Sequence, residues 1–191
     1  RSGAMPITGP LTISVPGTLR GWSTLSRIGG RFGLPALLAP AIALARDGTQ
    51  VTASLARNLA SHAAVVNADP GLRGVLSADG RPLGVGETFR QPALAETLEV
   101  VASGGADAFY GGALGKSFVA GLARLGSPLR LDDLTAHQTE VTDPLAGAYR
   151  GSEVLTMPPN SQGILLLEML GALDPLVERL DPAGEDAPRI G

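Results

Sequence analysis

One stretch constrains the fold of this chain more than any other: Met-Pro-Pro-Asn-Ser-Gln-Gly at residues 157–163, here called the elbow. A short extended run, residues 152–156, precedes it, and the most apolar run of the chain, residues 164–170, follows it. The two prolines cannot donate backbone hydrogen bonds, and they hold the chain extended. Asn and Ser then offer side-chain oxygens to the free amides of a helix start. The elbow therefore predicts a strand, a rigid turn and a buried helix.

Composition is sufficient for a real core and excludes several classes of function. The chain has 191 residues, of which 44% are hydrophobic and only 4% aromatic, so a core of Leu, Val and Ala is expected. The net charge is −3 and Lys116 is the only lysine, which argues against a nucleic-acid partner. No apolar run reaches the roughly 18 residues of a membrane span. Cysteine is absent, so the compartment is left open.

Hydrophobic periodicity predicts a helix-rich α+β fold with a minority of strand. The helix at 36–47 is apolar on nearly all sides and is expected to be buried. The ends, 1–10 and 181–191, are expected to be loop-like, and no linker marks a boundary, so 1–191 is interpreted as one partial domain. Helices are expected at 19–28, 36–47, 52–66, 92–103, 114–125, 131–134 and 163–173, and strands at 11–15, 141–149 and 152–156. Loops with short extended pieces are expected at 69–89, and a short link at 107–110.

The run Gly-Ala-Leu-Gly-Lys-Ser at residues 112–117 is similar to a phosphate-binding loop. That motif needs four residues between its first glycine and Gly-Lys-Ser, so that enough backbone amides surround the phosphates. The position of that first glycine is Tyr110 here. A solvated helix N-terminus is the better interpretation, and nucleotide binding is not expected.

Titratable residues do not assemble a catalytic site in the sequence. His62 lies on an apolar helix face and is expected to be a hydrogen-bonded core residue, while His137 is expected to cap or pack. Two histidines without cysteine make a poor metal site, so we expect no metal and no cofactor. Asp132 and Asp133 are adjacent, so their side chains point apart on a helix, and they indicate a helix start rather than a catalytic pair.

Six short motifs follow one another along the chain, and together they resemble the large subunit of the gamma-glutamyltransferase (gamma-glutamyltranspeptidase) family, which includes cephalosporin-acylase-like members. Each motif is short, but six in order over about residues 5–175 are highly specific. The motifs are Val-Pro-Gly at 15–17 with Gly-Trp at 21–22, Pro-Ala-Ile-x-Leu-Ala-Arg-Asp-Gly at 40–48, Gln-Pro-x-Leu-Ala-x-Thr-Leu at 91–98, Phe-Tyr-Gly-Gly at 109–112, Asp-Leu at 133–134 with Pro-Leu at 144–145 and Tyr-Arg-Gly at 149–151, and Pro-Pro-Asn-Ser-Gln-Gly at 158–163.

The resemblance implies part of a four-layer αββα N-terminal-nucleophile hydrolase, made as a precursor that cuts itself into two subunits. The new N-terminal Thr of the small subunit is then the nucleophile, with its own amine as base. The family places that residue in a Thr-Thr-His-type segment, and this chain has no Thr-Thr pair. We therefore expect no catalytic residue in these 191 residues and no activity from them alone.

The elbow departs from the Pro-Pro-Pro-Ser-Ser-Gly-Gly form of gamma-glutamyl transpeptidases and is closer to the Pro-Pro-Asn-x-Gln-Gly form of acylase-like members. Its polar residues Asn160, Ser161 and Gln162 are the candidates for substrate contact, although holding the helix start is the better-supported role. The acyl donor and acceptor stay open.

The implied partners are a small-molecule acyl-amide substrate, the small subunit and the remaining large-subunit segments of its own precursor. Residues 164–170 should pack against strands of those segments, so we expect the isolated chain to self-associate. The alternative is a catalytically inactive helical binding or assembly module on the same scaffold. A Thr-initiated segment downstream in the gene would favour the enzyme.

Overall fold

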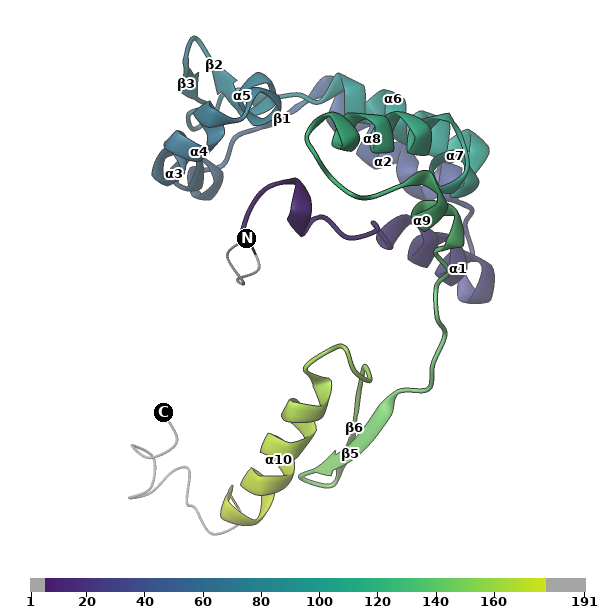
Figure 1. Ribbon diagram of the computed structural model, residues 1–191. Helices are drawn as coiled ribbons and strands as arrows, with labels where there is room; N and C mark the ends of the chain where they lie inside the picture. Colours follow the sequence, from purple (N-terminus) through teal and green to yellow (C-terminus); the bar gives the residue numbers. More distant parts are fainter. Residues whose placement is uncertain (1–5, 178–191) are drawn as a thin grey trace. The chain divides into compact units, whose positions relative to one another are not determined.

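The computed structural model of the protein describes residues 6–177, and the expected loop at 181–191 lies outside them. Contacts between Cα atoms divide the chain into two compact units, Arg1–Thr139 and Glu140–Gly191. Each is drawn in Figure 1 and is described by itself below. That the two units form one domain stays a prediction.

The first unit is mostly helical. Its four short strands form two antiparallel pairs, β1 with β4 and β2 with β3. Helices α2 and α6 make the most extensive contact in this unit and are joined by an Arg46–Glu99 ion pair. The elements are η1 (Pro10–Thr12), α1 (Thr18–Gly29), α2 (Leu34–Asp47), β1 (Thr49–Gln50), α3 (Ala53–Ser61), α4 (Ala63–Ala68), α5 (Pro70–Leu76), β2 (Ser77–Ala78), β3 (Arg81–Pro82), β4 (Thr88–Phe89), α6 (Pro92–Gly104), α7 (Asp107–Tyr110), α8 (Ala113–Arg124) and α9 (Leu131–Ala136).

Several sequence predictions in this unit are wrong, each for a local reason. The strand expected at 11–15 is absent because Pro10 begins a 3₁₀ turn, in which the Thr12 hydroxyl donates to the Gly9 carbonyl at 2.8 Å. The expected loop at 69–89 contains α5, since the Asp69 carboxylate accepts from Leu72 N at 2.8 Å and caps the helix that Pro70 begins. The expected link at 107–110 is the one-turn helix α7.

The amphipathic helix expected at 52–66 is interrupted at His62, which leaves helical geometry between α3 and α4. Its Nδ1 atom lies 2.9 Å from the Asn58 carbonyl oxygen, and the Ser61 hydroxyl donates to the same oxygen at 3.0 Å. Side chains that compete for a helical carbonyl disrupt the backbone ladder. His62 is also exposed, so its predicted place in the core is wrong although its predicted hydrogen bond is present.

Helix α2 ends at Asp47 as predicted, and Gly48 follows it with a φ of 90°. Its expected burial on all sides is wrong: Leu38 is its one buried residue, and Leu37 and Leu44 are 51% and 59% exposed. The helix is covered chiefly on the side that meets α6, so its other apolar faces stay open within this unit. A hollow of about 700 Å³ lies between α1 and α2.

Tyr110 ties together the start of α1 and the segment around α7 and α9. It is 1% exposed and shares a buried cluster with Ala106 and Leu134. Its hydroxyl donates to the Pro16 carbonyl at 2.5 Å and accepts from Arg20 N at 3.1 Å. Because the cap residue of α1 is a glycine without a side-chain oxygen, the Tyr110 hydroxyl satisfies one of the free amides of that helix start.

The second unit is a β-hairpin with a helix against one face; the two strands and the helix are predicted by the sequence, but their packing on each other is not. The first strand begins at Leu145 rather than at 141, and the helix, expected to be buried, has no buried residue within this unit. Strands β5 (Leu145–Tyr149) and β6 (Ser152–Thr156) are antiparallel, and Arg150 and Gly151 turn between them with φ of 52° and 75°. Helix α10 (Gly163–Val177) lies against the hairpin in Figure 1, with Leu167 under Gly147. The turn is held by a hydrogen bond of 3.1 Å from Arg150 N to the Asp174 carboxylate.

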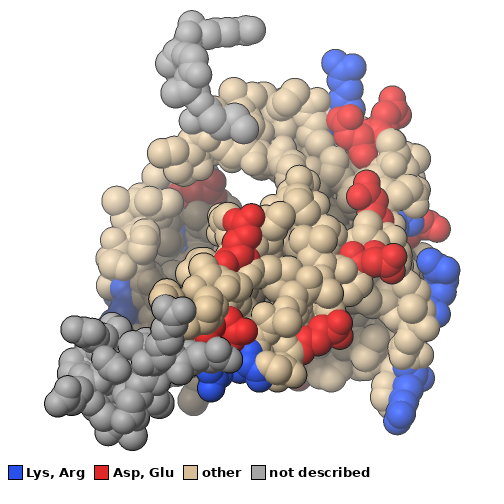
Figure 2. All heavy atoms as spheres, turned by 90° about the horizontal axis from the view of Figure 1, so that it is seen from below, with Lys and Arg blue, Asp and Glu red and all other residues tan. Residues whose placement is uncertain are grey.

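Basic side chains stand beside acidic ones on the face that Figure 2 shows, with uncharged surface between them. That face therefore carries no broad region of one sign. Within residues 6–177, no helix is long and apolar enough to cross a membrane.

Candidate functional site

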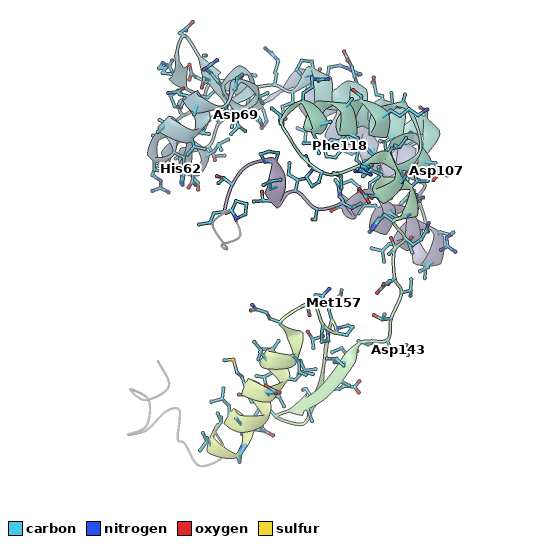
Figure 3. The ribbon with its side chains drawn as sticks, in the orientation of Figure 1. His62, Asp69, Asp107, Phe118, Asp143 and Met157 are labelled. Atoms are coloured by element: carbon cyan, nitrogen blue, oxygen red, sulfur yellow. The ribbon has the colours of Figure 1, made fainter. Side chains whose placement is uncertain are left out.

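The elbow connects β6 to α10, and hydrogen bonds of Ser161 hold its turn together. The Ser161 hydroxyl donates to the Met157 carbonyl at 2.7 Å and accepts from Gly163 N at 3.1 Å. Its backbone amide donates to the Pro158 carbonyl at 3.1 Å, which closes the turn. Met157 is labelled in Figure 3 at the point where the chain leaves β6. The predicted helix-start role of Ser161 is confirmed by these contacts.

Gly163 lets the first turn of α10 approach the end of β6. A Cβ atom there would overlap Thr156 Oγ1, and it would lie 2.5 Å from the Met157 carbonyl oxygen and 2.8 Å from Thr156 Cγ2. No larger residue fits without moving backbone. The glycine that closes the motif is thus required by packing, independently of any contact with substrate.

Asn160, Ser161 and Gln162 are all exposed, and the first and third differ from Ser161 in their hydrogen bonding. Among the described residues neither side chain has a hydrogen-bond partner, while the Gln162 carbonyl accepts from Leu165 N at 3.1 Å within the helix. The predicted capping by the Asn160 side chain is therefore not seen. A hollow of about 220 Å³ borders the elbow, lined by Thr142, Pro144, Leu155, Thr156, Met157 and Pro158. Asn160 and Gln162 are left free to contact a ligand.

The chemistry of Ser161 is limited by its hydrogen bonds. Its proton points to a carbonyl oxygen rather than to a base, and no histidine, aspartate or glutamate of residues 6–177 hydrogen-bonds to it. An activated nucleophile needs an adjacent base. Ser161 is a positioning residue in this geometry.

The other sequence candidates resolve into structural roles. Asp133 accepts from Arg130 N at 2.7 Å and starts α9, whereas Asp132 is exposed, as a helix start predicts. His137 ends α9 and stacks on Tyr110, with ring centroids 5.6 Å apart, so its predicted packing role is confirmed. Within the described part of the chain, no group of three or more metal-ligating side chains is placed to hold an ion.

The run at 112–117 forms the start of α8, not a phosphate loop. Gly112 is the N-cap residue of α8, and Gly115 is buried in its first turn. Only glycine fits at position 115, because a Cβ atom there would overlap the Phe109 carbonyl oxygen. The solvated helix start is as predicted, since Ala113, Lys116 and Ser117 are exposed. Only Gly115 of this run is buried, where α7 and α8 pack closely.

The ion pair between Arg81 and Glu87 is not predicted by any sequence pattern. Arg81 donates to both Glu87 oxygens at 2.7 and 2.8 Å, and Gly84 N donates to the same carboxylate. The Arg81 hydrogen bonds, with that of Gly84, lower the pKa of Glu87 from 4.5 to about 2. Glu87 is therefore ionised near neutrality and cannot act as a general acid there.

The described fold is a helix-rich α+β arrangement that solved N-terminal-nucleophile hydrolases share. Gamma-glutamyltranspeptidase from Helicobacter pylori matches with a TM-score of 0.85 and 25% identity, over 93% of this chain and 50% of that one. Cephalosporin acylase from Bacillus halodurans matches with a TM-score of 0.82 and 32% identity, over 89% of this chain and 33% of that one. The fold class expected from the sequence is confirmed.

The chain belongs to the gamma-glutamyltranspeptidase family, whose sequence model, described as Gamma-glutamyltranspeptidase, matches residues 1–187. Oxamate amidohydrolase proenzyme from Klebsiella pneumoniae is 38% identical over 90% of this chain and 34% of its own length. Acylase ACY 1 proenzyme from a Pseudomonas species is 35% identical over 88% of this chain and 30% of its own length. The chain thus spans about a third of the length of these curated relatives, which are hydrolases and acylases made as proenzymes.

Proposed function

We propose that the whole protein is a self-processing amide hydrolase or acyl transferase, and that the chain of 191 residues supplies scaffold rather than nucleophile. The observation that carries the proposal is the family match over residues 1–187, with relatives that are proenzymes. The absence of a nucleophile with an adjacent base among residues 6–177 supports the second half. A terminal Thr elsewhere in the precursor would attack the amide carbonyl with its own amine as base, while backbone amides bind the oxyanion.

The elbow supports an acyl amide other than a gamma-glutamyl amide as the preferred substrate. Ser161 and Gly163 fix the turn, while the exposed side chains of Asn160 and Gln162 have no hydrogen-bond partner among residues 6–177. We assign these two side chains to the rim of the substrate site. A carboxamide can both donate and accept hydrogen bonds, whereas the serine and glycine of the gamma-glutamyl form offer a smaller contact.

The substrate assignment is tested with the full-length protein on three amides: glutathione, oxamate and a cephalosporin with an acyl side chain. The account predicts a higher kcat/KM for oxamate or the cephalosporin than for glutathione. The double variant Asn160→Ser, Gln162→Gly imitates the gamma-glutamyl form, and it should move the ratio of kcat/KM values toward glutathione by about 10-fold.

A matched control replaces an exposed Asn and Gln away from the elbow, Asn67→Ser with Gln138→Gly. If both double variants changed the ratio of kcat/KM values equally, the proposed contact between the elbow and the substrate would be contradicted. Amide hydrolysis by the purified 191-residue chain would contradict the proposal that this chain alone is inactive. Lack of activity in a full-length protein that stays uncut would favour the inactive binding module.

A further inference from the structure

We propose that residues 49–89 form a lobe that opens and closes as one cooperative unit while the rest of the first unit stays folded. The inference does not rest on the proposed activity, and it uses only contacts within residues 6–139. The lobe contains α3, α4 and α5 with both strand pairs, and its two ends join α2 to α6. Figure 1 draws its three helices together with β2 and β3.

The lobe has a hydrophobic core of its own, made only from residues within 51–89. The buried and partly buried members of this core are Val51, Leu55, Ala56, Leu59, Val66, Leu76, Ala78, Leu83 and Phe89. The second cluster of the first unit, around Ala106, Tyr110 and Leu134, takes no residue from the lobe. Because neither cluster crosses the boundary, opening of the lobe does not uncover the second cluster.

Polar contacts follow the same boundary. Among the described residues, the hydrogen bonds of the lobe's side chains and its Arg81–Glu87 ion pair all join two residues of the lobe. Helices α3, α4 and α5 make their extensive contacts with one another and with β2 and β3. The main connection between the lobe and the rest of the unit is therefore the place where its two ends enter and leave.

This connection, here called the neck, consists of β1, β4 and the residues beside them. Val51 N donates to the Glu87 carbonyl at 2.8 Å, and Gly86 N donates to the Val51 carbonyl at 2.9 Å. A Cβ atom on Gly48 would lie 2.6 Å from Thr88 Cγ2, so only glycine lets the two chain ends pass this closely. The neck closes the lobe into a loop whose ends meet.

Outside the neck, α2 and α6 hold these ends together without the lobe. Gln91 N donates to the Ala45 carbonyl at 2.8 Å, and Arg90 Nε donates to the Asp47 carbonyl at 2.9 Å. The same two helices share the ion pair described above. Since a loop of about 2–5 residues can join two packed helices, the pairing of α2 with α6 does not require the lobe.

The lobe is built from short elements on a small core. Its helices have 9, 6 and 7 residues, and helices shorter than about 12–15 residues are marginal on their own. A hollow of about 620 Å³ separates part of α3 from the segment 81–85. Few buried contacts give a segment a low free energy of local opening, so the lobe should open before the helices around Tyr110.

Hydrogen exchange of the full-length protein, measured by mass spectrometry on peptides, tests the proposal. Leu59→Ala removes a buried side chain from the lobe's core, and Leu134→Ala is the matched control in the second cluster. We expect Leu59→Ala to speed exchange in α3, α4 and α5 by about 30-fold or more, with less than about twofold change in α2, α6 and α8. Leu134→Ala should speed exchange in α7 and α9 and leave the lobe unchanged.

Equal acceleration of the lobe and of α2 or α6 by Leu59→Ala would overturn the proposal, as would acceleration of the lobe by Leu134→Ala. A Leu59→Ala protein that fails to fold as a whole would overturn it too, because opening of the lobe should leave the rest folded.

A second variant replaces residues 49–89 of the full-length protein by a short glycine–serine linker between Gly48 and Arg90. It should keep a cooperative thermal transition and slow exchange in α2 and α6. Loss of that protection would contradict the independence of the lobe. Neither readout measures amide hydrolysis, so failure here and failure of the proposed activity are distinguishable.

Discussion

At the scale of single residues, the hydroxyl of Tyr110 joins two of the sequence motifs. It bonds the Pro16 carbonyl and Arg20 N, while the Arg20 guanidinium lies 4.3 Å from the Tyr110 ring centroid and pairs with Asp107 at 2.8 Å. Two motifs that are far apart in sequence therefore meet for structural reasons.

Tyr110→Phe removes both hydrogen bonds of the hydroxyl and leaves the ring in place. The Pro16 carbonyl and the Arg20 amide then lose their partner, so the free energy of unfolding should fall by about 1–3 kcal/mol. Urea denaturation checks the value. The control is Tyr149→Phe, whose hydroxyl has no hydrogen-bond partner among residues 6–177 and should change stability much less. Equal losses in both variants would contradict the role given to Tyr110.

Glu87 predicts a pH dependence of stability. Its pKa is lowered from 4.5 to about 2 by the Arg81 hydrogen bonds and that of Gly84 N, so ionised Glu87 stabilises the folded state above pH 4.5. The stabilisation is lost as pH falls from about 4.5 through about 2, because the folded carboxylate must then take up a proton.

Denaturation at pH 5 and at pH 2.5 measures this loss, and Glu87→Gln should show a smaller difference between the two conditions. Asp132→Asn, an exposed carboxylate without a resolved ion pair among residues 6–177, is the control. A Glu87→Gln variant as pH-sensitive as the parent would exclude the assigned ion pair.

Sequence reasoning at this scale succeeds where a residue acts on its near neighbours. Asp133 and Ser161 were predictable because each bonds backbone within four residues. Arg81 with Glu87 and Tyr110 with Pro16 depend on turns and on long-range packing, and no periodicity encodes them. The periodicity puts His62 on an apolar face because it does not reveal the break between α3 and α4.

At the scale of elements, the elbow is held by a glycine that cannot be enlarged. Gly163→Ala places a methyl group against Thr156 and the Met157 carbonyl, and it should cost about 1–3 kcal/mol of unfolding free energy. Gly171→Ala, in the same helix with nothing within 4 Å of the new atom, should instead stabilise by roughly 0.5–1 kcal/mol. Thermal melts of the pair give the comparison. Stabilisation by both substitutions would show that α10 does not pack closely on β6.

The elements that the sequence predicted well have strong local signals. The hairpin of β5 and β6, the helix after the elbow and the end of α2 at Gly48 follow from alternation, prolines and a glycine at positive φ. The predicted strand at 11–15 and the predicted burial of α2 are wrong. Both depend on which other segments pack against them, and the local sequence pattern does not specify those segments.

At the scale of the whole molecule, exposed apolar faces predict that the isolated chain self-associates. The exposed Leu165, Met169, Leu173 and Leu176 of α10 and the hollow between α1 and α2 are both open within their units. Light scattering at tens of micromolar should show oligomers, and Met169→Glu should reduce them relative to Val141→Glu. A monodisperse monomer would contradict this expectation.

The central claim is that this scaffold belongs to a precursor that cuts itself and places its nucleophile at a new terminus. Intact mass and N-terminal sequencing of the full-length gene product, purified without added protease, test it most directly. We predict two polypeptides in equal amounts, the larger containing residues 1–191 and the smaller beginning with Thr. A single uncut chain, or a cut that leaves another residue at the new terminus, would contradict the account.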